Sequence, residues 1–196
     1  MTFGAVEAGS VKFKVSNIFL PMKGKWLTAR MTIGGHTDQP LLIGRFKGYS
    51  DTPTADRKYR DVVAYDALYD ILNADVAAWY NTVFPSHKEQ QKDKDGKTTT
   101  VTVYDPVTMK QFRDSFFKHF GIEQADIALI NDNMSIEKTV AVTASSETSS
   151  ATEESSTIGE SMSGKEVLSC ICEINGCMGH MGRDGKFHYI CLLYTS

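Results

Sequence analysis

Residues 163–190, SGKEVLSCICEINGCMGHMGRDGKFHYI, constrain the fold more than any other stretch of this chain. Ser163 and Glu166 have the S-x-x-E spacing of a capping box, in which each side chain takes up a backbone N–H at the start of a helix. Asn175 and Gly176 tolerate the left-handed conformation found at helix C-termini. The pattern predicts a helix over 164–175, with an apolar face formed by Val167, Leu168, Ile171 and Ile174.

A β-hairpin is predicted directly after this helix. Asp184 and Gly185 lie between Met181 and an alternating run that carries Phe187. An Asp-Gly pair flanked by alternating apolar residues is a strong signal for a two-residue hairpin turn. Residues 161–190 are therefore expected to form a helix followed by a hairpin, and we expect this unit to be truncated at its C-terminal end.

The last six residues, 191–196, do not continue this pattern. Their sequence, CLLYTS, can be encoded as TGT CTC TTA TAC ACA TCT, one reading frame of the transposon end used to fragment DNA for sequencing. A processing scar of this kind is excluded from fold reasoning. We therefore expect 191–196 to be an adapter artefact and the natural protein to continue beyond Ile190.

Composition limits the class of protein. The chain has 196 residues, 41% of them hydrophobic, which is enough apolar material for one large or two small domains. Its net charge of -3 argues against a nucleic-acid surface, which usually needs a basic excess. No apolar run has the length of a membrane span, and the N-terminus lacks the order of a signal peptide. A soluble protein made in the cytoplasm is the expectation, and four cysteines do not indicate a disulfide framework.

Residues 1–66 are predicted to form a small antiparallel β-domain. Apolar and polar residues alternate over 11–16 and over 27–33, which is the period of a half-buried strand. Two further strands are predicted over 41–49 and 58–65, with a turn between them over residues 50–56. Four strands at this spacing favour a small barrel or a sandwich.

A helical or mixed insertion domain is predicted over residues 67–142. Asp66 is placed to cap a short helical turn, and Asn73 is placed to cap a second helix over 73–84. Residues 87–100 are polar and charged, so a solvated loop or hairpin tip is expected there.

A third helix is predicted over 107–120. Asp105 is expected to be its N-cap, Pro106 its first residue and Gly121 its stop. The apolar stripe of this helix consists of Met109, Phe112, Phe116 and Phe120. An aromatic stripe at helical spacing can bind a partner but more often packs in the core, so we expect these residues to be core. Further core candidates are Ile127, Leu129, Ile136 and Val140.

Residues 143–160, TASSETSSATEESSTIGE, form a Ser/Thr/Glu tract with almost no apolar content. Such a segment buries too little surface to offset the entropy lost on ordering. We expect a disordered loop or linker, which gives the chain an α+β organisation: a barrel-like domain with a helical insertion, then a C-terminal helix–hairpin unit.

One group of residues has the composition of a metal site. Cys170, Cys172, Cys177 and His180 form C-x-C-x4-C-x-x-H. Zinc ligands usually come in pairs spaced C-x2-4-C on loops, whereas Cys170 and Cys172 lie about 200° apart around a helix. Because buried free cysteine commonly packs as a small hydrophobe, we expect no metal site.

The sequence contains no recognisable catalytic motif. There is no G-x-S-x-G, no H-E-x-x-H and no P-loop, and the glycines of 176–185 do not open a helix after a strand. Neither the histidines nor the carboxylates are spaced like an acid–base pair: His36, His87, His119 and His188; Asp126, Asp132 and Glu137. We predict that the chain is not an enzyme and has no catalytic or cofactor-binding residue.

Several short stretches, taken in order, resemble tail hub or tail-tip structural proteins of phages and prophages that infect Gram-positive bacteria. Besides the C-terminal segment they are Phe3-Gly4, 11–17, Val63-Ala64-Tyr65-Asp66, Trp79-Tyr80-Asn81, Phe112-Arg113-Asp114, 131–134 and Glu137-Lys138-Thr139. Each stretch is weakly specific alone, and their order carries the resemblance. It covers residues 2–190 except the Ser-rich tract.

The resemblance implies small β-barrel domains with α/β insertions, assembled as a ring at a tail tip or baseplate hub. It implies a homo-oligomer, which we expect to be a trimer, with distal tail and tape-measure proteins as neighbours and the virion as location. Because members often carry more barrel sequence before Thr2, Met1 is expected to be internal. The alternative function is the N-terminal fragment of a tail-associated peptidase or cell-wall hydrolase whose catalytic domain lies beyond Ile190.

Purified protein should contain well under one equivalent of zinc, because its cysteines are expected to pack as hydrophobes rather than to bind metal. Elemental analysis after dialysis checks this. Stoichiometric zinc that disappears in Cys172→Ala and His180→Ala variants would contradict it.

Overall fold

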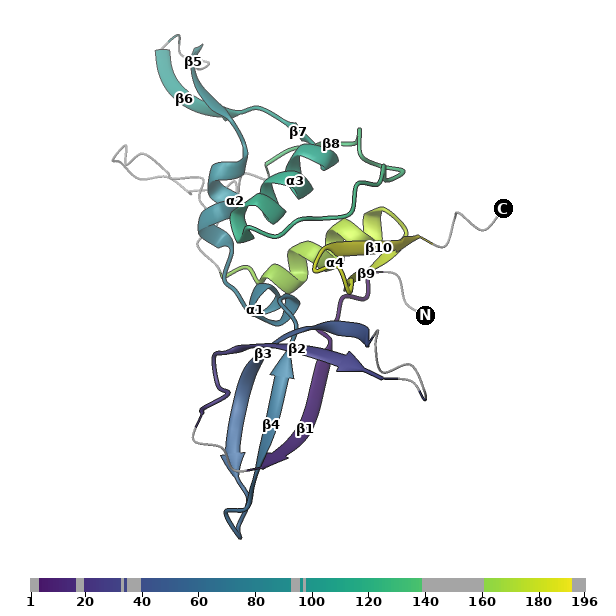
Figure 1. Cartoon of the computed structure of the whole chain (residues 1–196). Helices are drawn as coiled ribbons and strands as arrows, with labels where there is room; N and C mark the ends of the chain where they lie inside the picture. The colour runs from purple at the N-terminus through teal and green to yellow at the C-terminus, as the bar shows by residue number, and fades with distance from the viewer. Residues whose placement is uncertain are drawn as a thin grey trace.

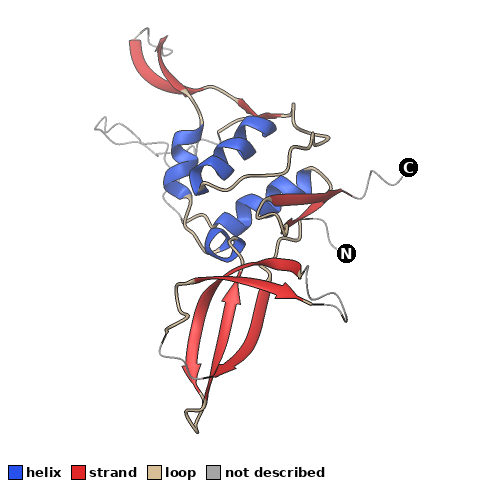
Figure 2. Ribbon diagram, viewed as in Figure 1, coloured by secondary structure: helices blue, strands red, loops and turns tan. Residues whose placement is uncertain are grey.

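The predicted α+β architecture is confirmed. A curled four-stranded antiparallel half-barrel lies at one end, and the C-terminal helix packs against a β-hairpin (Figure 1; Figure 2). No helix among the described residues is long and apolar enough to cross a membrane. The computed structural model describes residues 4–16, 20–32, 34, 40–92, 96, 98–138 and 161–191.

The half-barrel contains the four predicted strands in the order β1-β4-β3-β2. Their bounds are Ser10–Ser16 for β1, Trp26–Met31 for β2, Leu41–Pro53 for β3 and Tyr59–Tyr65 for β4. The predicted turn over 50–56 is wrong in its first part, since residues 50–53 continue β3. Asp51 lies opposite Val62 and forms a 2.5 Å ion pair with Arg60, which holds this extension against β4.

The apolar face of the half-barrel buries little surface. Phe46, Val62 and Ala64 are buried on it, but none of them belongs to the main core cluster. Phe13, which lies opposite Val62, is only half-buried on the edge strand β1. The half-barrel therefore has the amphipathic alternation of a barrel without the closed core of one.

The main core lies in the other part of the molecule, between the helices and the C-terminal hairpin. Its elements are α1 Leu68–Leu72, α2 Ala77–Val83, α3 Met109–Phe120, α4 Gly164–Ile174, β9 Cys177–Met181 and β10 Phe187–Cys191. The aromatic stripe of α3 is core, as predicted: Phe112 and Phe116 are buried and contact Trp79 edge-to-face, and Phe120 packs on Phe116.

Two predicted helix starts are wrong. Asn73 does not cap α2; its amide donates to the Tyr69 carbonyl at 2.7 Å, and Asp75 instead accepts the Ala77 N–H at 3.0 Å. Asp105 and Pro106 do not open α3. Thr108 does, because its hydroxyl and the Gln111 side chain form a complete capping box.

Thr108 can act as a cap because the residues before α3 are held as a strand. β7 (Val107–Thr108) pairs with β8 (Ser135–Ile136), a pairing that the short sequence pattern did not indicate. Of the core candidates in this region, Leu129 is buried, Ile127 and Ile136 pack against the core, and Val140 lies outside the described residues.

The polar stretch expected as a loop or hairpin tip forms the arms of a hairpin. β5 (Ser86–Lys92) pairs with β6 (Thr98–Tyr104), and every residue of β5 is exposed. Figure 1 shows this hairpin extending away from the helices.

The predicted C-terminal helix and hairpin are confirmed as α4, β9 and β10. Ser163 and Glu166 form a complete capping box, and Gly176, with φ +60°, follows the C-cap of α4. The two-residue turn is wrong: five residues connect β9 to β10, and Gly182 donates its N–H to the Lys186 carbonyl. Cys191 is the last residue of β10, whereas residues 192–196 and the tract 143–160 lie outside the described residues.

The N-terminal segment belongs to the main core rather than to the half-barrel. Val6 forms a parallel bridge with Gly179 of β9 and is almost completely buried. Gly4 donates its N–H to the Cys177 carbonyl, and Gly179 donates to the Ala5 carbonyl. The half-barrel is therefore tied to the core at both of its ends, through this segment and through α1.

Gly164→Ala should destabilise the fold, because an added Cβ would lie 2.1 Å from the Ile71 carbonyl oxygen where α4 meets α1. We expect the free energy of unfolding to fall by about 1–3 kcal/mol, measured by urea denaturation. Gly34→Ala is the control, since no atom lies within 4 Å of its added Cβ. Equal stability of the two variants would show that the α1–α4 contact is looser than described.

Candidate functional site

The cysteines of the C-terminal unit do not converge with His180. Cys170 is exposed, whereas Cys172 and Cys177 are buried, and the Cys177 thiol donates to the Cys172 carbonyl at 3.4 Å. Cys172 and Cys177 belong to the packed core. Within the described ranges, no group of three His, Cys, Asp or Glu side chains is arranged to hold a metal ion.

The histidines lie on separate elements. His87 is on the β5–β6 hairpin, where hydrogen bonds to Glu89 and then Asp105 raise its pKa. His119 packs on Phe120, and His188 contacts Asp184 at 2.9 Å. His36 lies outside the described residues. His188 also faces His180 across the C-terminal hairpin, with ring centroids 5.7 Å apart, whereas His87 and His119 lie on other elements.

Among the described residues, Arg113 of α3 is the buried polar group with the most hydrogen-bond partners. Its Nε and Nη2 donate to the two oxygens of Asp132 at 2.8 and 2.9 Å, which is the bidentate pairing that a planar guanidinium favours. Nη2 also donates to the Ile127 carbonyl, and Nη1 to the Gln124 side chain at 2.6 Å. Tyr189 of β10 donates to the same Gln124 oxygen, so one network joins α3, segment 122–132 and the hairpin.

This network fixes the charge of Asp132. Burial alone would raise the pKa of Asp132, but hydrogen bonds from Arg113 and from the Leu129 N–H hold that pKa below its usual value. A carboxylate that is ionised and fully paired inside the fold is a structural element. Asp132 therefore does not form an acid–base pair with Asp126, which is exposed.

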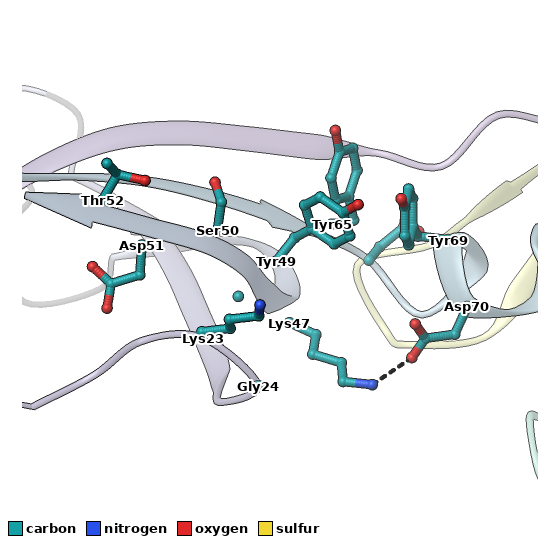
Figure 3. Close-up of a pocket in the computed structure, with 12 residues that line it drawn as sticks. Lys23, Gly24, Lys47, Tyr49, Ser50, Asp51, Thr52, Tyr65, Tyr69 and Asp70 are labelled. Carbon is teal, nitrogen blue, oxygen red and sulfur yellow. Dashed lines mark hydrogen bonds and ion pairs between the residues drawn. The ribbon is translucent and has the colours of Figure 1, made fainter.

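A pocket of about 530 Å³ lies where β3 and β4 meet α1 (Figure 3). Three tyrosines group at one side of it, and Ser50, Asp51 and Thr52 lie farther along β3. Its size is in the range of small-ligand sites.

Backbone features of the sequence build this pocket. Gly48 lets the segment before β2 approach β3, since a Cβ there would lie 2.1 Å from the Met22 carbonyl oxygen. Gly24, with φ +76°, donates its N–H to the Gly48 carbonyl and so brings Lys23 to the rim. The register of β3 against β4 shifts between Gly48 and Ser50, which inserts Tyr49 as the extra residue. A bulge of this kind turns a side chain away from the regular alternation.

The tyrosines form one aromatic cluster. Tyr65 and Tyr69 are stacked, with ring centroids 4.3 Å apart, and Tyr49 meets both of them edge-to-face. The hydrogen bond with Tyr49 raises the pKa of Tyr69 to about 12, so the Tyr69 hydroxyl stays protonated at neutral pH. Tyr49 remains 52% exposed, which leaves ring surface open to solvent.

Charge in the pocket is balanced. Lys47 forms a 2.6 Å ion pair with Asp70, and Asp51 is neutralised by Arg60. Asp66 accepts the N–H of Gly9 and of Leu68, and burial raises its pKa in spite of these bonds. The pocket therefore offers both hydrogen-bond donors and hydrogen-bond acceptors, and it carries no strong net charge.

No family of protein sequences and no curated protein sequence matches the chain. Among solved structures, its fold is similar to that of a 43 kDa tail protein of prophage MuSo2 from Shewanella oneidensis, with a TM-score of 0.50 and 13% sequence identity. The likeness covers 93% of this chain and 43% of that protein. The chain thus spans less than half the length of the tail protein, and at this identity the likeness concerns the fold.

Sequence reasoning did not find the pocket. One signal was available, since Tyr65 and Tyr69 are four residues apart at a strand-to-helix junction, and Tyr65 lies in the Val63-Ala64-Tyr65-Asp66 stretch that carries part of the resemblance. The bulge at Tyr49 left no signature, because it depends on the pairing of β3 with β4.

Asp132→Asn should destabilise the protein strongly at pH 7, because it leaves the Arg113 charge buried and unpaired; we expect a loss of about 3–5 kcal/mol. The lowered pKa also means that Asp132 stabilises the fold above the pKa of an unfolded Asp, near 4, and that this stability disappears as pH falls through the folded-state value. Urea unfolding at pH 7 and pH 3 measures both effects.

The control is Asp126→Asn, which makes the same change at an exposed carboxylate of the same segment and should be nearly neutral. Equal stability of the two variants at pH 7 would show that the Arg113 network is not structural.

Proposed function

We propose that this chain is part of a structural protein of a phage or prophage tail, contributing to the tail tip or baseplate hub and so to tail assembly and host attachment or genome delivery. The observation that carries this proposal is the fold similarity to the prophage MuSo2 tail protein over 93% of the chain. It agrees with the resemblance to tail hub proteins found in the ordered sequence stretches.

The open half-barrel supports an assembly role. β1 and β2 are the two edge strands, and an edge strand presents unpaired backbone N–H and C=O groups that are available for pairing. The apolar face of the half-barrel is only partly buried. Contacts with a neighbouring subunit would cover both features.

Exposed apolar side chains point to β2 and the start of β3 as a contact region. Trp26 and Met31 of β2 are 50% and 45% exposed, and Leu41 of β3 is 40% exposed. Met31 and Leu41 are register partners, so they form a continuous apolar surface. A contiguous exposed apolar surface on a protein often marks a site of contact with another protein.

In this proposal the chain self-associates as a ring-like homo-oligomer, with distal tail and tape-measure proteins as neighbours in the virion. The trimeric state rests on analogy with tail hubs. Residues 1–190 have an architectural role, and any peptidase or cell-wall hydrolase would be a separate domain of a longer protein.

Light scattering coupled to size exclusion tests self-association. The complete reading frame that contains this chain should form an oligomer at micromolar concentration. Met31→Glu should weaken association by about tenfold or more, because it places a charge in the apolar contact. Gln90→Glu on the exposed β5 strand adds the same charge elsewhere and should leave association unchanged.

A protein that remains strictly monomeric at micromolar concentration, with hydrolytic activity in this segment, would contradict the proposal. If Met31→Glu and Gln90→Glu change association by the same amount, β2 is not the contact surface. The proposed tail role would then rest on the fold similarity alone.

A further inference from the structure

We propose that the pocket bounded by Tyr49, Tyr65 and Tyr69 binds a neutral, hydroxyl-rich saccharide, with a sugar ring stacked on Tyr49. The proposal is independent of the tail role, since it is argued from the chemistry of the pocket alone.

The aromatic cluster provides a surface for one face of a sugar ring. The C–H groups of a pyranose carry partial positive charge and pack favourably on the negative face of an aromatic ring. Tyr49 has open ring surface, being 52% exposed, and its contacts with Tyr65 and Tyr69 hold it in a fixed orientation. Because the ring is already ordered, little entropy is lost when a ligand stacks on it.

Polar groups stand within the same pocket to bind hydroxyls. Asp70 and Lys47 supply an acceptor and a donor beside each other, and Figure 3 shows their ion pair next to Tyr69. Ser50 and Thr52, on β3, supply groups that both donate and accept. A sugar hydroxyl also both donates and accepts, so it can use each of these groups.

The balance of charge favours a neutral ligand over a polyanion. Lys47 is paired with Asp70, and the other charged residues that line the pocket are Lys23, Asp51 and Asp66. A site for phosphate or nucleic acid would need an excess of basic groups, which this pocket does not have.

Isothermal titration calorimetry on the full chain tests the proposal with three neutral probes: maltotetraose, cellotetraose and chitotriose. Inorganic polyphosphate is the charged comparison. At least one neutral probe should bind saturably at concentrations up to about 10 mM. Tyr49→Ala should weaken that binding about tenfold, since it removes one stacking contact. Tyr49→Phe keeps the ring and should retain it.

Tyr59→Ala is the matched control, because Tyr59 is a tyrosine of the same sheet that is 45% exposed and does not line the pocket. It should bind as the unchanged chain does. The proposal is overturned if no neutral probe binds, if Tyr49→Ala binds as tightly as Tyr59→Ala, or if only polyphosphate binds. The oligomeric state of the protein affects none of these outcomes, so the two proposals can fail separately.

Discussion

The buried Arg113–Asp132 pair is the interaction on which the helical part of this fold depends. Residues 122–132 have no regular secondary structure of their own, and the guanidinium holds them to α3 through Asp132, Gln124 and the Ile127 carbonyl. Tyr189 connects the same network to the C-terminal hairpin. Because a buried charge is stable only when it is fully paired, the arrangement selects one position for this long segment. Fixing the segment then allows Leu129 to close the core.

The two parts of the molecule differ in how complete they are. The helices and the C-terminal hairpin share a core with many fully buried side chains, and the N-terminal residues around Val6 complete it. Among the described residues of the half-barrel, the buried hydrophobic side chains are those of Phe46, Val62 and Ala64, and β1 and β2 are its two open edges. A domain that buries so little surface gains little stability from folding alone. This difference is the physical reason for proposing that the half-barrel works in an assembly.

Local signals in the sequence predicted most of the elements. Alternation located four strands, and the capping box at Ser163 located α4, because both signals act over a few residues. The start of α3 at Thr108 was not predicted. The conformation of Thr108 depends on the pairing of β7 with β8, and its register partner Ser135 is distant in sequence. The pocket was missed for the same reason: the bulge at Tyr49 and the close approach at Gly48 depend on partners that are distant in sequence.

Hydrogen–deuterium exchange tests the central claim, that the half-barrel is unfinished in the isolated chain and completed by its neighbours. In the isolated chain, the amides of β1 and β2 should exchange much faster than those of α3 and α4, because edge strands over a small core open easily. In assembled particles, the same strands should become protected while α3 and α4 change little. Equal protection of the half-barrel and of α3 in a monomer, with no change on assembly, would contradict the account.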